Sequence, residues 1–143
     1  MKTVTLEKFK NFEPCWMETA EGTARLEKIG SRKKEWTVLD VLGLEEVSAK
    51  DRLWAVLREE FIPANTLHEF ACRCAEEALR KAGVIDERSW NAIRVKRLWI
   101  EGKATDAELS AAWAAAWAAA RDAAWAAAGV EQIKMLIALL EEE

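Results

Sequence analysis

The stretch SAAWAAAWAAARDAAWAAAG, residues 110–129, is the part of the sequence that decides the fold class. Alanine has the highest helix propensity of all residues, so this stretch predicts a long helix. Larger side chains recur every four residues from Leu109, directly before the stretch, through Trp113, Trp117, Arg121 and Trp125. Four residues turn a helix by about 400°, so this row drifts by about 40° at each step. We therefore expect a slanting tryptophan ridge, defined as Trp113, Trp117, Arg121 and Trp125, on a rod of alanine.

Three uses of this ridge compete. A membrane span would place Arg121 and Asp122 near its middle, at a cost of about 2.5–3.5 kcal/mol each. Helix packing is favoured instead, because alanine faces let helices approach closely and tryptophans fill the grooves between them. The third use is a ligand site, in which the indole faces stack on a nucleobase and Arg121 meets a phosphate.

Capping signals divide the rest of the chain into short helices. Helix starts are predicted at Ser48, Asp86, Thr66–Glu69 and Thr105–Glu108, the last two spaced as capping boxes. Helix ends are predicted at Gly83 and Gly102. The segment TVLDVLGL begins at Thr37, and we read it as a short helix opened by Thr37 in preference to a strand.

Hydrophobic periodicity predicts which faces of two of these helices are buried. For the helix that follows Ser48, which is expected to stop before Pro63, the apolar positions at helical spacing are Leu53, Trp54, Leu57, Phe61 and Ile62. For the helix that follows Pro63, the expected inner face is Leu67, Phe70, Ala71, Cys74, Ala78 and Leu79.

Composition points to the same class. With 6 glycines and 2 prolines in 143 residues, the chain has few turn residues, which favours long helices over many strands. We expect an all-α fold, a compact single-domain bundle of about six or seven helices. Residues 1–143 form this one domain, with a less regular part at 1–47 and a helical core at 48–143.

Charge and cysteine usage limit the partners and the compartment. The net charge of −4 does not favour nucleic acid as a partner. Basic residues do lie near tryptophans around residues 88–103, so Arg94 and Arg97 join the ridge as candidate ligand- or partner-binding residues. The first fifteen residues contain no apolar signal segment, and the three cysteines predict reduced thiols in a cytoplasm.

No motif predicts catalysis. His68, Cys72 and Glu76 are spaced by four on one helix, but there is no second histidine and no C-x-x-C pair, so we expect neither a metal nor another cofactor. The single histidine has no flanking nucleophile signature. We therefore expect no enzymatic activity. Asp86 and Arg88 are interpreted as structural residues that form a helix-start cap and a salt link between helices.

The second half of the chain resembles a known family. The segments CAEEAL, DERSWNAI and EGKAT, followed by the alanine-rich helix, resemble the helical immunity protein family of bacterial toxin–immunity loci and related small phage proteins. The resemblance covers residues 74–128. It departs at Ser89, where members often have proline, and in the tract, where they often have histidines. It implies a non-catalytic helical protein that binds another protein.

The expected function is therefore inhibition of a protein partner, such as a toxin or nuclease, in the cytoplasm of a bacterium or a phage-infected cell. One alternative is a small-ligand or nucleotide-binding protein that uses the tryptophan ridge. A second alternative is a homo-oligomeric structural protein with the ridge as its seam.

Overall fold

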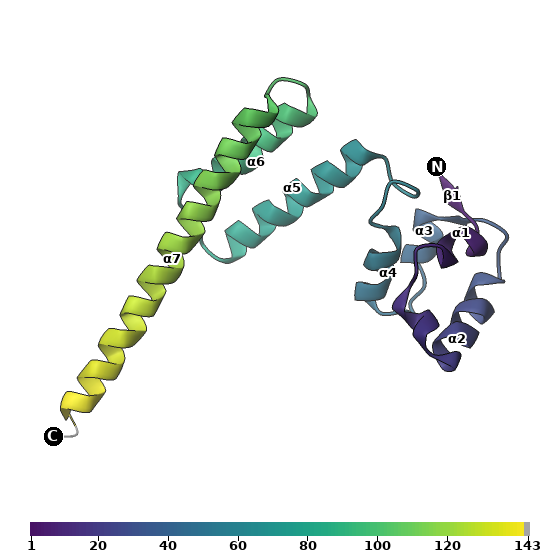
Figure 1. Ribbon diagram of the computed structural model, residues 1–143, viewed down its shortest axis with the longest axis horizontal. Coiled ribbons are helices and arrows are strands. Elements are labelled where there is room, and N and C mark those ends of the chain that lie inside the picture. The colour runs from purple at the N-terminus through teal and green to yellow at the C-terminus, as the bar shows by residue number, and fades with distance from the viewer. Residues whose placement is uncertain (142–143) are drawn as a thin grey trace. The chain divides into compact units, whose positions relative to one another are not determined.

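The chain is helical throughout most of its length (Figure 1). The computed structural model describes residues 1–141, with the side chains at positions 125, 128, 130–132, 134–136 and 138–141 outside the description. Within these residues the elements are β1 (Thr3–Val4), α1 (Leu6–Lys10), the 3-10 helix η1 (Cys15–Glu18), α2 (Ala20–Gly30), β2 (Trp36–Thr37), α3 (Val38–Leu42), α4 (Ala49–Val56), α5 (Ala64–Lys81), α6 (Glu87–Ile100) and α7 (Asp106–Glu141). The predicted all-α class is confirmed.

The contacts divide the chain into two compact units. The first unit runs from Met1 to Leu67 and the second begins at His68. The division falls inside α5. The single folding domain stays a prediction.

A two-stranded antiparallel ribbon organises the first unit. Thr3 pairs with Thr37 and Val4 with Trp36. Val4 is part of the core, which it shares with Ala55, Val56 and Phe61. The sequence analysis did not predict these strands, because two residues are too few to show an alternating pattern.

The short helix α3 begins at the predicted residue. The Thr37 hydroxyl accepts a hydrogen bond from the Asp40 amide, and the Asp40 carboxylate accepts one from the Thr37 amide, which completes a capping box. An ion pair with Lys33, together with these Thr37 hydrogen bonds, lowers the pKa of Asp40 to about 2. The predicted helix at this position is therefore confirmed.

The helix predicted to run from Ser48 to the residue before Pro63 is shorter than expected. It stops at Val56, and the chain leaves helical geometry at Leu57. Of the predicted apolar positions, Leu53, Trp54 and Leu57 are exposed, whereas Phe61 is buried and Ile62 packs against the core. Because the helix ends early, Phe61 reaches the core from a turn, and the helical spacing assumed across residues 53–62 does not apply.

In the second unit, the two glycine ends are confirmed. Gly83 and Gly102 have φ values of +65° and +73°, the left-handed conformation that glycine adopts without strain. The amide of Val84 bonds to the Leu79 carbonyl, and that of Lys103 to the Leu98 carbonyl, the bonds of a Schellman motif.

Helix α5 differs from its prediction at its start and in its inner face. It begins at Ala64, directly after Pro63, so Thr66 and Glu69 do not form the predicted capping box. Cys72 is its buried residue, whereas Phe70 and Cys74 on the predicted inner face are exposed. Glu69 instead pairs with Arg73 and Arg97.

Helices α6 and α7 pack side by side through small residues (Figure 1). The buried residues at this contact are Ala92 and Ile93 of α6 and Ala112 and Ala119 of α7. Ala112 and Ala119 are seven residues apart and share one face of α7. The helix also continues through Gly129. Strong helix formers on both sides offset the cost of one glycine.

Candidate functional site

The described part of the tryptophan ridge is exposed. Trp113 is 51% and Trp117 is 66% exposed. Helix geometry explains the trend: relative to buried Ala112, these side chains are rotated by about 100° and about 140°. The drift of the row carries it away from α6, while the alanine face makes the contact. The expectation that the tryptophans fill grooves between helices is therefore wrong for Trp113 and Trp117.

The other members of the ridge follow the same drift. Arg121 is exposed and lies about 180° around the helix from Ala112. The side chain of Trp125 lies outside the described residues. Only Trp113, Trp117 and Arg121 are therefore used below, and we call these three the exposed row.

Arg97 lies away from the exposed row and binds within the chain. Its guanidinium, on α6, donates to the carboxylates of Glu69 and Glu76 on α5, with a 3.1 Å Nε–Oε2 distance to Glu69. Hydrogen bonds from Arg97 lower the pKa of both glutamates. The side chains of Arg97 and Glu76 are only partly exposed, which strengthens such pairs relative to fully solvated ones. Arg97 thus ties α5 to α6.

Asp86 and Arg88 link helix ends. The Asp86 carboxylate accepts from the Arg88 amide at 2.9 Å, which caps α6. The Arg88 guanidinium pairs with Asp86 at 2.8 Å and with Asp122 of α7 at 2.9 Å. The Arg88 side chain, and then its amide, lower the pKa of Asp86 to about 2.

Arg94 is exposed, and its Nη2 donates to the Asn91 side chain at 2.6 Å. It therefore makes a local contact on α6, apart from the exposed row. Of the six candidate binding residues, the structure groups only Trp113, Trp117 and Arg121 on one described surface.

The His68–Cys72–Glu76 series faces α6. The His68 ring meets the Trp99 ring edge-on at 5.5 Å between centroids. Cys72 is buried, which raises the pKa of its thiol. Glu76 is held by Arg97. Among the described residues, no group of three potential ligands is arranged to hold a metal ion.

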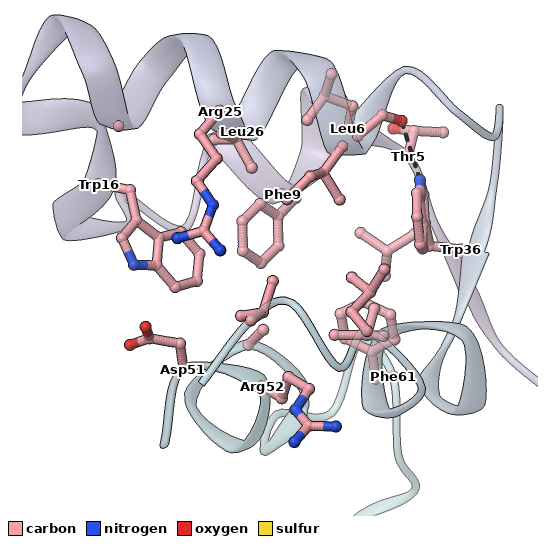
Figure 2. Close-up of a pocket in the computed structure, with 18 residues that line it drawn as sticks. Thr5, Leu6, Phe9, Trp16, Arg25, Leu26, Trp36, Asp51, Arg52 and Phe61 are labelled. Atoms are coloured by element: carbon pink, nitrogen blue, oxygen red, sulfur yellow. Dashed lines mark hydrogen bonds between the residues drawn. The ribbon is translucent and has the colours of Figure 1, made fainter. Parts of the chain in front are cut away.

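A second candidate site lies in the first unit, where the sequence analysis named no functional residue. It is a partly open cavity of about 150 Å³ between α1, α2 and the residues of α3, α4 and their loops (Figure 2). Its walls are mainly apolar and include Phe9, Trp16, Leu26, Trp36, Ala55 and Phe61. Phe9 and Trp16 stack at 6.0 Å between centroids, and the Trp36 indole donates to the Gly30 carbonyl at 3.0 Å.

Three charged residues belong to the lining of this cavity: Arg25, Asp51 and Arg52. Arg25 donates to the Glu46 carbonyl, and Arg52 donates to the Leu42 carbonyl at 2.6 Å. The Nε of Arg52 is buried without an acceptor among the described residues. No periodic pattern indicates this cavity, because its lining comes from many short segments spread over residues 4–61.

Comparisons with known proteins add no assignment. Among residues 1–141, no helix has both the length and the apolar content needed to cross a membrane. The chain matches no family model, and neither curated proteins nor solved structures gave a significant match.

Proposed function

We propose that the protein is a non-catalytic binding protein that recognises another protein through the exposed row of α7. The supporting observation is the exposure of two tryptophans, Trp113 and Trp117, on one flank of a helix whose alanine face already packs on α6. Tryptophan and arginine are the residues most enriched in the energetic centres of protein interfaces. Trp113 is 51% and Trp117 is 66% exposed, and a partner would bury the solvated parts of both indoles.

The composition of the row suggests the chemistry of the partner surface. Two indoles supply apolar area, and Arg121 one turn further supplies a guanidinium. We infer a partner with an apolar groove bordered by carboxylates. The resemblance to immunity proteins supports a bacterial or phage inhibitor of a toxin or nuclease, acting in the cytoplasm. Asp122, the sequence neighbour of Arg121, forms an ion pair with Arg88. Arg121 is therefore the cation that the exposed row presents to a partner.

Nucleotide binding by the same row is a weaker proposal. The three side chains follow the convex flank of one helix, so a nucleobase stacked on Trp117 would have no opposite wall. Stacking on a single face exposes the other face of the base to water, and binding sites for small ligands are typically concave.

Self-association is favoured by a different observation. Ile133 and Ile137 are 61% and 51% exposed. They project within about 60° of the Ala112 direction, so they continue the apolar face of α7. With 36 residues, α7 is longer than the 14-residue α6 that covers its first part. A second copy packed on this continuation would bury both isoleucines.

A comparative capture experiment tests the protein-binding proposal. The immobilised full-length chain, the double variant Trp113→Ala/Trp117→Ala and the control Ile85→Ala are exposed to the toxin or nuclease encoded beside the gene, and to host lysate. Ile85 is a large apolar residue outside the row and is 91% exposed. We expect a stoichiometric partner on wild type and control, and at least about a tenfold loss on the double variant. Equal capture by all three, or no stoichiometric partner, would contradict the proposal.

Light scattering separates self-association from binding of a different protein. A homo-oligomer that becomes a monomer in Ile133→Glu/Ile137→Glu, but not in Trp113→Ala/Trp117→Ala, would assign the seam to the apolar face of α7. A monomer at all concentrations would exclude the seam.

A further inference from the structure

The cavity of the first unit has no part in the proposed protein-binding function. We propose that it binds a small carboxylate with an apolar body, the body filling the cavity and the carboxylate meeting Arg25. This site is independent of the exposed row, which lies on α7 of the second unit.

The size of the cavity sets the size of the apolar body. A cavity of about 150 Å³ with apolar walls holds one benzene-sized ring or a branched chain of similar volume. The stacked pair Phe9 and Trp16 forms part of the wall, and Figure 2 shows the Phe9 ring at the centre of the lining residues. Aromatic and aliphatic walls favour an apolar ligand body, because its transfer from water is favourable and the walls gain contacts.

The charged lining residues select the polar end. Arg25 extends from α2 and lines the cavity together with Trp16 and Phe9 (Figure 2). One of its nitrogens donates to the Glu46 carbonyl, which holds the guanidinium in place. Its other N–H groups have no acceptor in the part of the chain that the structure describes. A guanidinium binds a carboxylate through two parallel hydrogen bonds, so Arg25 presents the matching donors.

Arg52 also favours a negatively charged ligand. It also lines the cavity, and its buried Nε has no acceptor among the described residues. Asp51 carries the one negative charge of the lining, against two guanidinium groups. The balance is therefore positive and favours an anion over an amine of the same shape.

The experiment titrates the full-length chain with three probes that share one carbon skeleton: phenylacetate, phenethyl alcohol and phenethylamine. Binding is followed by calorimetry and by the proton NMR signals of the probe. We expect saturable binding of phenylacetate, weaker binding of the alcohol and no binding of the amine. In Arg25→Gln the affinity for phenylacetate falls at least about tenfold, while Arg73→Gln, an exposed arginine of α5, leaves it unchanged. Equal binding of the three probes, or unchanged affinity in Arg25→Gln, overturns the proposal.

A second variant tests the cavity without changing its charge. Ala55 is 2% exposed and lines the cavity, so Ala55→Leu fills it from inside. We expect the affinity for phenylacetate to fall while the midpoint of thermal unfolding is kept. Retained affinity in a folded Ala55→Leu protein would place the ligand elsewhere and overturn the proposal. Partner capture is expected to persist in Arg25→Gln and Ala55→Leu, so failure of one proposal leaves the other standing.

Discussion

Trp36 in the first unit and Trp117 in the second place the same side chain in opposite environments. Trp36 is 8% exposed, pairs through β2 with Val4 and donates its indole hydrogen bond to Gly30. Trp117 is 66% exposed and lies one turn from Arg121, which is also exposed. The first unit buries large side chains, whereas the buried residues of α7 at the α6 contact are alanines. Residue size therefore does not predict burial across this chain.

The difference follows from the length of the elements. The first unit consists of helices of at most eleven residues outside α5, which meet at many angles and leave gaps that large side chains fill. Helices α6 and α7 run side by side over several turns, and small residues allow that close approach. A long side-by-side contact between two helices therefore favours alanine at the contact. The tryptophans Trp113 and Trp117 of α7 lie outside this contact and are exposed.

The largest expected effect comes from truncating the two tryptophans. Trp36→Ala removes a buried ring and its hydrogen bond, and we expect the free energy of unfolding to fall by about 3–5 kcal/mol. Trp117→Ala removes a solvated ring and should change it by no more than about 0.5 kcal/mol. Urea unfolding followed by circular dichroism measures both. Similar losses in the two variants would show that Trp117 is covered in solution and would remove the contrast between the units.

The next effect tests the alanine contact directly. Ala112→Leu introduces three heavy atoms at a residue that is 6% exposed, and we expect a loss of about 1–3 kcal/mol through overpacking against α6. Ala114 is exposed on the same helix and makes Ala114→Leu the matched control, with no expected loss. Thermal unfolding compares the two. Equal stability of both variants would mean that α6 and α7 do not pack closely at Ala112.

The helix ends could be predicted from sequence because capping is local. Thr37, Ser48, Asp86, Gly83 and Gly102 each act within a few residues of their own position. The inner faces of α4 and α5 could not be predicted in this way. Periodicity identifies an apolar stripe, but which stripe is buried depends on the neighbouring helix, and that information is spread over the whole unit.

The candidate sites show the same limit. The four-residue spacing of the ridge correctly predicts a slanting row, but its exposure depends on where α6 packs. Arg97 shares a basic helix with Arg94, yet it pairs with Glu69 and Glu76 because α5 lies opposite it. The cavity of the first unit is formed by side chains such as Phe9, Trp36 and Phe61 that are distant in sequence, so no single segment carries its signal.

Each unit contains an aspartate that caps a helix, Asp40 for α3 and Asp86 for α6. The pKa values of these two carboxyl groups compare the two units at low pH. The pKa is about 2 for Asp40, held by Lys33 and Thr37, and about 2 for Asp86, held by Arg88. Unfolded aspartate has a pKa of about 3.9. Because both folded values are lowered, the stabilisation is complete above pH about 4 and is lost as pH falls toward 2.

Carboxyl-carbon NMR measures these two titrations. We expect Lys33→Met to raise the pKa of Asp40 and Arg88→Met to raise that of Asp86, with neither substitution affecting the aspartate of the other unit. The backbone amide bonds from residues 37 and 88 remain, so both values should stay below that of unfolded aspartate. A pKa near 3.9 in the unmodified protein would contradict the capping geometry of that unit.

The smallest expected effect contrasts two glycines that lack a positive φ. A Cβ at Gly129 of α7 would meet no atom within 4 Å, whereas one at Gly43, after α3, would lie 3.3 Å from the Leu39 carbonyl oxygen. Gly129→Ala removes backbone freedom from the unfolded chain and should stabilise the helix by about 0.5–1 kcal/mol. Gly43→Ala gains the same entropy but loses part of it to the close contact, so it should be nearly neutral. Thermal unfolding distinguishes them, and a destabilised Gly129→Ala would contradict the open space around this position.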